Sequence, residues 1–234
     1  MGFALISKSA GRAYVAFRAQ PRAVLLAVFL FVLVLVTCVL LAEFVIYVWD
    51  PAEPVRRIAS SLSTGLSYNW FLIGLVRYFL ALLNEQPVRL ARLFLGWPGF
   101  IPLLLLNLVQ GLILGALFLP GFFLTTRLTG SFLGPLLFFM AVPAVFFLTI
   151  KLNFAFVFVI DRRLDLFDAL LKAFQATAGS FWSVTLLLIL CGLIAAAGLL
   201  VLGIGFLASG GFALLLYLAA YENLAGEIPA RKSR

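Results

Sequence analysis

The sequence predicts an all-α integral membrane protein, and three observations lead to that fold class. Of its residues, 65% are hydrophobic and only 11% are charged, and the mean hydropathy is +1.18. The apolar residues gather in several runs near the length of about 20 residues that a helix needs to cross a hydrocarbon core of about 30 Å. Lysine and arginine residues are distributed unevenly between the segments that join these runs. Together these features exclude a soluble globular domain.

The apolar runs define six predicted spans within a single membrane domain that covers residues 1–234. Their approximate limits are 23–49, 62–83, 101–120, 135–160, 182–206 and 210–225. Glycines at positions 203, 205, 210 and 211 predict a break or tight outer turn between the last two spans.

The run 62–83 contains Arg77, so the distribution of basic residues tests whether it spans. If it spans and the N-terminus is cytoplasmic, the basic residues outside are Arg56, Arg57 and Arg127. Those inside are Lys8, Arg12, Arg18, Arg22, Arg89, Arg92, Arg162, Arg163, Lys172, Arg231, Lys232 and Arg234. If it does not span, most of these cations fall outside, against the positive-inside rule. The rule therefore favours six spans with both termini in the cytoplasm.

Three segments have the apolar spacing of an amphipathic helix, and each precedes a predicted hairpin of spans. They cover residues 1–20, 86–97 and 165–181. This spacing is typical of a helix that lies in the membrane interface with its apolar face in the headgroup boundary. One interpretation is a threefold repeat of interfacial helix plus hairpin. The other is that amphipathic loops occur in any multi-pass protein.

The basic residues predict anionic lipid headgroups at the cytoplasmic face as partners. The candidate lipid contacts are Lys8, Arg12, Arg18, Arg22, Arg89, Arg92, Arg162, Arg163 and Lys172. The net charge of +8 does not indicate nucleic acid, because no stretch is polar enough to form a basic nucleic-acid-binding domain.

Ionisable and amide side chains inside spans are costly, so each one is a candidate for function. The candidate polar spot consists of Lys151, Asn153, Asn107, Gln110, Glu43 and Glu222. Lys151 lies about 14 Å from the inner end of its span at helical rise, near the midplane. A functional interpretation is a site for an anionic headgroup or a path through the bundle. A structural interpretation is an ion pair or hydrogen bond that fixes the register of the helices.

The inventory for catalysis is poor. There is no histidine, the two cysteines, Cys38 and Cys191, lie in apolar runs, and no phosphate-binding loop, nucleophile elbow or HExxH motif occurs. The sequence therefore predicts neither catalytic residues nor a metal or cofactor, and an enzyme is not expected.

The C-terminal part of the chain resembles the YciC-type family of bacterial membrane proteins, which is related to the membrane domain of some glycerophosphodiester phosphodiesterases. The residues that carry the resemblance are Asp161-Arg162-Arg163, Ala169-Leu170, Phe181-Trp182, Gly203-Ile204-Gly205, Tyr217 and Tyr221. It covers residues 135–226 and, beyond them, only the general layout. The resemblance implies six spans with interfacial helices and supplies no activity.

The expected function is that of a non-enzymatic protein of the bacterial inner membrane, an accessory or scaffold subunit in envelope or lipid homeostasis. The alternative is a membrane subunit of a transporter for a small or lipidic substrate, with partner membrane subunits. A connected polar pocket among the later spans would favour transport, and a dry, packed bundle would favour the scaffold.

Overall fold

The structure is a computed structural model that describes residues 2–49, 52–94, 99–127, 133–200 and 205–226. Within these ranges the chain is helical, without a β-strand. The elements are α1 (Gly2–Ala19), α2 (Pro21–Trp49), α3 (Glu53–Leu83), η1 (Leu90–Phe94), α4 (Phe100–Arg127), α5 (Leu133–Arg162), α6 (Leu166–Ala178), α7 (Phe181–Leu200) and α8 (Gly205–Gly226). Two compact units are formed, one by residues 1–100 with 180–234 and the other by residues 101–179.

Among the described residues, six helices are long and apolar enough to cross a membrane. They are α2, α3, α7 and α8 with the segments Phe100–Pro120 of α4 and Pro135–Arg162 of α5. The predicted class of multi-pass helical membrane protein and the predicted number of spans are therefore confirmed at the level of helix length and composition. Which side of the membrane each end faces stays a prediction.

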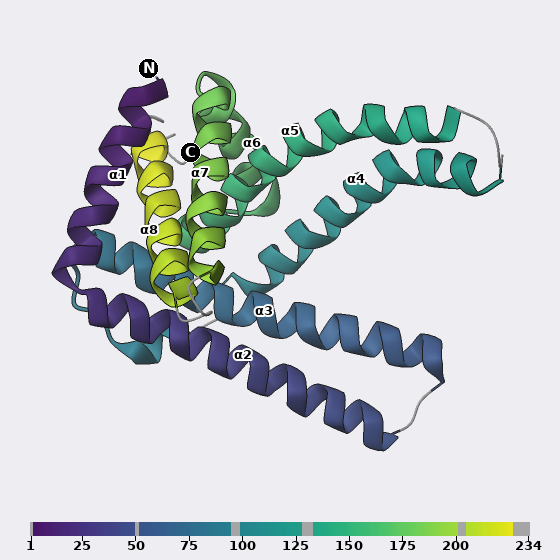
Figure 1. Ribbon diagram of the computed structural model, residues 1–234, viewed down its shortest axis with the longest axis horizontal. Coiled ribbons are helices and arrows are strands. Elements are labelled where there is room, and N and C mark those ends of the chain that lie inside the picture. Colours follow the sequence, from purple (N-terminus) through teal and green to yellow (C-terminus); the bar gives the residue numbers. More distant parts are fainter. Residues whose placement is uncertain (1, 50–51, 95–98, 128–132, 201–204, 227–234) are drawn as a thin grey trace. The chain divides into compact units, whose positions relative to one another are not determined.

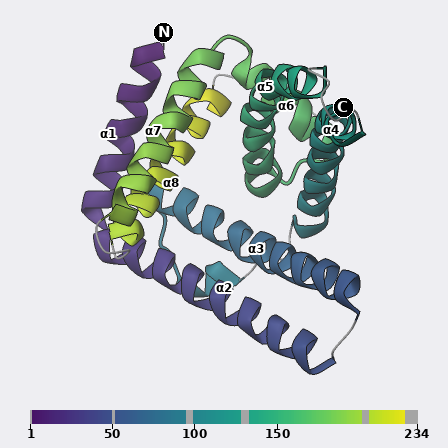
Figure 2. The same ribbon diagram turned by 45° about the vertical axis from the view of Figure 1, so that its right-hand side comes forward.

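In the first unit, α1, α7 and α8 run side by side, and the hairpin of α2 and α3 runs crosswise to them (Figure 1). The turned view shows the same arrangement (Figure 2). The ring of Phe17 on α1 meets that of Phe212 on α8 with centroids 5.8 Å apart. Gly211 of α8 packs so closely on α2 that a Cβ there would lie 2.6 Å from Val24 Cγ1.

In the second unit, α6 packs against α5 through its small side chains. Ala169, Ala173 and Thr177 are buried, while Phe167 and Leu171 on the other side of α6 are exposed. The Thr177 hydroxyl donates to the carbonyl of Ala173 at 2.8 Å, which satisfies a polar group in this contact. The predicted helix 165–181 is thus confirmed as a helix over Leu166–Ala178. Its interfacial position stays a prediction.

The helices that contain the fifth and sixth predicted spans have limits that differ from those of the spans. The fifth helix ends at Leu200 and the sixth begins at Gly205, so Gly205, Gly210 and Gly211 lie within α8 rather than in a break. The close approach of α2 leaves no room for a side chain at Gly211, and such close helix contacts are a common reason for glycine inside a span. Gly203 lies outside the described residues.

The second predicted span starts earlier than expected, at Glu53, with Pro54 in the first turn, where proline is well tolerated. Serine and threonine residues between positions 60 and 64 hid this part of the helix from a hydropathy argument. Here α3 pairs with α2, and the Ser60 hydroxyl donates to the Glu43 carboxylate.

The prediction of an amphipathic α-helix over 86–97 was wrong for the described residues 86–94. In that stretch the structure has the 3-10 helix η1 and no α-helix. A left-handed backbone at Glu85, with φ of 54°, and Pro87 after it prevent α3 from continuing. The segment returns along α3, where the Leu93 carbonyl oxygen lies 1.9 Å from the place that a Cβ on Gly74 would occupy. Residues 95–98 lie outside the described ranges.

Since α1, η1 and α6 differ in length and type, the threefold repeat gains no support from them and stays a prediction.

The predicted helix over residues 1–20 is confirmed as a helix. It lies antiparallel along α8, as the contacts of Ser9 with Asn223 and of Phe17 with Phe212 show. A helix that only crossed the C-terminal end of α8 would not make both contacts. Whether α1 also lies in the membrane interface stays a prediction.

Candidate functional site

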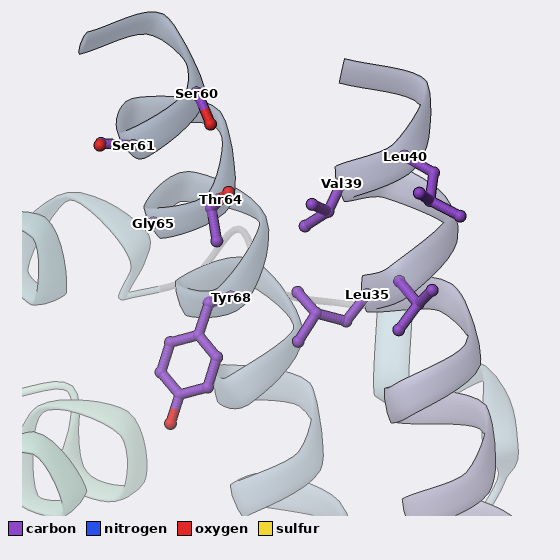
Figure 3. A pocket seen from close by; sticks show the side chains of 9 residues that line it. Leu35, Val39, Leu40, Ser60, Ser61, Thr64, Gly65 and Tyr68 are labelled. Carbon is purple, nitrogen blue, oxygen red and sulfur yellow. The ribbon is translucent and has the colours of Figure 1, made fainter. Parts of the chain in front are cut away.

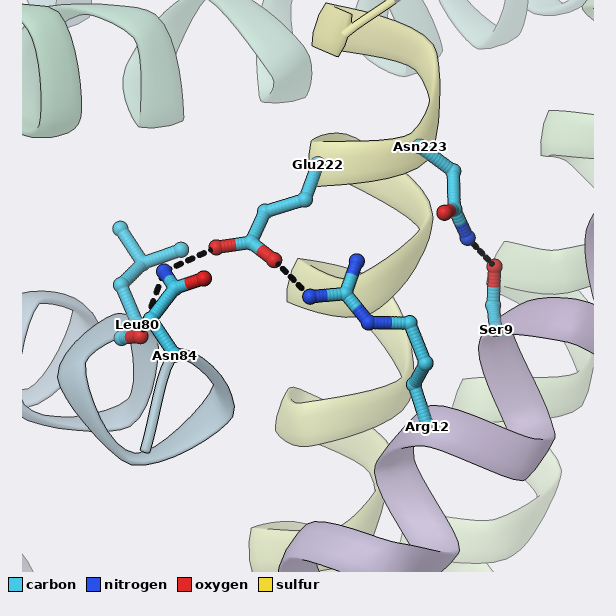
Figure 4. Close-up of polar contacts among 6 residues, drawn as sticks. All are labelled: Ser9, Arg12, Leu80, Asn84, Glu222 and Asn223. Atoms are coloured by element: carbon cyan, nitrogen blue, oxygen red, sulfur yellow. Dashed lines mark hydrogen bonds and ion pairs between the residues drawn. The ribbon is translucent and has the colours of Figure 1, made fainter. Parts of the chain in front are cut away.

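The best defined polar cluster of the first unit joins α1, the end of α3 and α8 (Figure 4). Arg12 Nη2 donates to Glu222 Oε2 at 2.6 Å, and Asn84 Nδ2 donates to Glu222 Oε1 at 2.6 Å. The side chain of Glu222 is 17% exposed and that of Arg12 is 37% exposed. The carboxylate is thus largely enclosed, and each of its oxygens accepts a hydrogen bond.

A second polar contact lies one position further along α8. Asn223 Nδ2 donates to the hydroxyl of Ser9, which is fully buried, at 3.0 Å. The two contacts fix α1 against α8 in one register, because buried polar groups are costly unless they are paired.

A groove adjoins this cluster, between one face of α1 and the end of α3. Its volume is about 590 Å³, within the range of about 300–1,000 Å³ that is usual for ligand sites. The lining residues are Ser7, Lys8, Gly11, Arg12, Val15, Ala16, Ala19, Gln20, Leu82, Leu83 and Glu85. The groove therefore has both charged and apolar walls.

A second groove, of about 680 Å³, lies between α2 and α3 (Figure 3). Leu35, Val39 and Leu40 line it on one side, and Ser60 and Tyr68 line it on the other, with further residues of the same two helices. It is open and mostly apolar. Glu43, a member of the predicted polar spot, is engaged nearby as the acceptor of the Ser60 hydroxyl.

Lys151 is 6% exposed on α5, in the second unit. Its Nζ lies 4.8 Å from the ring centroid of Phe147 and 4.7 Å from that of Phe174 on α6. No carboxylate among the described residues forms an ion pair with it, so the faces of the two rings take the place of the predicted acidic partner. This arrangement favours the structural interpretation of Lys151.

The remaining members of the predicted polar spot are Asn107, Gln110 and Asn153, all of them half-buried. Asn107 and Asn153 each take part in further interactions. Asn153 follows Lys151 by two positions, so the two side chains lie on different faces of α5. Glu43 and Glu222, in the first unit, each have their own contacts, and so does Lys151 in the second unit.

The predicted lipid contacts differ in how far they are available. Lys8, Arg18, Arg22, Arg89, Arg162 and Arg163 are exposed, while Arg12, Arg92 and Lys172 are half-buried. Arg12 is held by Glu222, and the guanidinium of Arg162 lies 5.6 Å from the ring centroid of Phe158. No group of three or more His, Cys, Asp or Glu side chains in the described part of the chain could hold a metal ion.

Among the residues of the cluster and the groove that sequence reasoning missed are Ser9, Asn84, Glu85 and Asn223. Ser9 and Asn223 are 214 positions apart, so no local pattern links them. Asn84 and Glu85 carried a weak signal, because polar residues directly after an apolar run commonly end a helix.

Comparison of the chain with protein-family models, with curated proteins and with solved structures finds no match. The resemblance to the YciC-type family therefore stays a prediction.

Proposed function

We propose that the protein is a non-enzymatic, multi-pass protein of the bacterial inner membrane that serves as a lipid-associated accessory or scaffold subunit. The observation that carries this proposal is the state of three charged residues inside the predicted spans. Glu43 accepts from Ser60, Glu222 accepts from Arg12 and Asn84, and Lys151 lies on two aromatic rings. Charged groups that serve chemistry or transport need a cleft in which they can meet a substrate, and these three are engaged within the protein.

The second support is the exposed basic surface. Lys8, Arg18 and Arg22 lie on or next to α1, which is anchored to α8 and cannot swing freely. Each basic residue near an anionic leaflet contributes about 1 kcal/mol of attraction. A basic helix fixed to the bundle fits a protein that holds its place by contact with lipid headgroups.

The alternative function is that of a transporter subunit, and the groove between α2 and α3 favours it. Ser60, Thr64 and Gly65 line this groove, and small or hydroxylated side chains let a helix of a partner subunit approach closely. In this case the groove would be covered in the assembled transporter.

Native mass spectrometry of the protein, extracted gently from its own membrane, separates the two functions. We expect a single chain that carries phospholipid. Stoichiometric partner subunits, above all an ATPase, would overturn the scaffold proposal in favour of transport. A chain free of both lipid and partners would contradict both.

A further inference from the structure

The groove between α1 and the end of α3 changes in character along its length. Its α1 wall is built from residues four apart, which share one face of a helix. Lys8 and Arg12 occupy the N-terminal half of that wall, and Val15, Ala16 and Ala19 occupy most of the C-terminal half, which ends at Gln20. A ligand that fills the groove along α1 would therefore meet charged side chains at one end and mainly apolar side chains beyond them.

The charges of the groove are balanced rather than basic. Arg12 is already neutralised by Glu222, whose second oxygen is held by Asn84. Lys8 and Glu85, which are both exposed, have no ion-pair partner among the described residues. Within the described part of the chain, the groove thus offers Lys8 as a cation and Glu85 as an anion to a ligand.

The position of Glu85 is fixed by the turn that ends α3. Its backbone N–H donates to the carbonyl of Leu82 at 3.2 Å, and the N–H of Gln86 donates to that of Ala81 at 2.9 Å. Glu85 has the left-handed φ of 54°, which is uncommon for a residue with a side chain. The turn therefore places a carboxylate on the wall of a groove whose opposite wall carries Lys8 and Arg12.

We propose that this groove binds one zwitterionic aminophospholipid, with its phosphate at Lys8 and its primary ammonium at Glu85. The acyl chains begin along Val15, Ala16 and Ala19 and continue past Leu82 and Leu83 into the bilayer. A purely anionic headgroup fits less well, because it would leave Glu85 facing a negative charge. A choline headgroup also fits less well, because its quaternary ammonium has no N–H to donate to the carboxylate. The inference rests on the proposed lipid association and adds the class of lipid and its place.

The experiment uses the full chain in nanodiscs that contain phosphatidylethanolamine, phosphatidylglycerol and phosphatidylcholine in equal amounts. The lipid retained after release into detergent is measured by native mass spectrometry. For the unmodified chain we expect one retained phosphatidylethanolamine in excess over the other two. Glu85→Gln should lower that excess about two- to fivefold, the size expected for one partly exposed ion pair. Lys8→Gln should lower the retention of all three lipids alike, because each of them carries a phosphate.

Gly11 offers a matched pair of variants that tests the position of the ligand. A Cβ at Gly11 meets nothing within 4 Å, so Gly11→Ala should fold, and its single methyl group should lower lipid retention much less than a larger side chain does. Gly11→Leu extends a side chain into the groove and should abolish the retained lipid while the melting temperature without lipid stays that of Gly11→Ala. Glycerophosphoethanolamine, the same headgroup without acyl chains, should not compete at the concentration of the lipid.

Equal competition by glycerophosphoethanolamine would overturn the assignment to a lipid. Retention of phosphatidylglycerol at least as strong as that of phosphatidylethanolamine, unchanged by Glu85→Gln and Gly11→Leu, would overturn this inference and leave the proposed lipid association intact. A chain that retains no phospholipid of any kind would overturn both.

Discussion

Two amphipathic helices of this protein, α1 and α6, are each held against a long apolar helix, but by opposite electrostatic means. On α8, the carboxylate of Glu222 meets the guanidinium of Arg12. On α5, the ammonium of Lys151 meets the rings of Phe147 and Phe174. In the first contact a charge is neutralised by an opposite charge, whereas in the second it is stabilised by the quadrupole of neutral groups.

The difference determines what happens when one partner is lost. Removing one member of an ion pair leaves the other charged and in a site built for its partner, which costs more than the pair contributes. Removing the cation from two aromatic rings leaves only apolar groups, and their burial in an apolar site carries no desolvation cost. Single substitutions in the contact of α1 with α8 should therefore lower the stability of the protein. In the contact of α5 with α6, loss of an aromatic ring should lower it, whereas loss of the Lys151 ammonium should not.

The largest effect is expected for Glu222→Ala, which removes the acceptor of both Arg12 and Asn84. We expect a loss of about 1–3 kcal/mol in the free energy of unfolding, because hydrogen bonds to charged groups are lost and Arg12 keeps its charge. Arg12 is partly exposed, so water recovers some of this cost and the lower half of the range is the better estimate. Thermal unfolding in detergent, followed by circular dichroism, measures it.

Two controls separate the charge from the loss of side-chain volume. The double variant Arg12→Gln with Glu222→Gln has no unpaired charge and should be more stable than Glu222→Ala. Asn223→Ala removes only a neutral hydrogen bond to Ser9 and should cost about 0.5–1.5 kcal/mol. If the double variant were the least stable of the three, the ion pair itself would stabilise the protein. The cost of Glu222→Ala would then not come from the unpaired charge of Arg12.

An intermediate effect is expected for Phe174→Leu, which keeps an apolar side chain on α6 but removes a ring from Lys151. We expect a loss of about 1 kcal/mol, smaller than that of Glu222→Ala, from the cation–π contact of a buried ammonium and from the smaller packed volume. Phe167→Leu on the same helix is the matched control, because Phe167 is 81% exposed. Equal melting temperatures for the two variants would show that the ring of Phe174 does not stabilise Lys151.

The helices could be predicted from the sequence because each apolar run is a local feature, and all six runs form helices of spanning length within the described residues. Helix limits failed where two local rules conflicted with packing. Gly210 and Gly211 indicated a break, yet α2 needs a small residue at Gly211. The spacing of Leu90, Leu93 and Phe94 indicated an α-helix, yet Leu93 is buried where its carbonyl approaches Gly74.

The candidate site could be predicted only as a set of residues whose polar side chains are costly to place inside a span. Their partners could not be predicted. Glu222 and Lys151 were singled out because a charge in a span is expensive, and both prove to be engaged. Their partners could not be inferred, since Arg12 is 210 positions from Glu222 and an aromatic ring is an ordinary residue in a chain with 25 phenylalanines. Pairing across a fold is set by the packing of helices, which one sequence does not reveal.

The smallest effect is expected for Lys151→Met, although Lys151 is the most deeply placed charge among the candidates. Methionine has a similar shape, fills the same space between Phe147 and Phe174 and makes favourable contacts between its sulfur and their rings. The substitution also removes the cost of an ammonium group in an apolar site, which offsets the lost cation–π contact. We expect the free energy of unfolding to change by less than about 1 kcal/mol, in contrast to Glu222→Ala. A loss above about 2 kcal/mol would mean that Lys151 has an anionic partner in the membrane, and a stable protein that no longer supports growth of its host would restore the functional interpretation of Lys151.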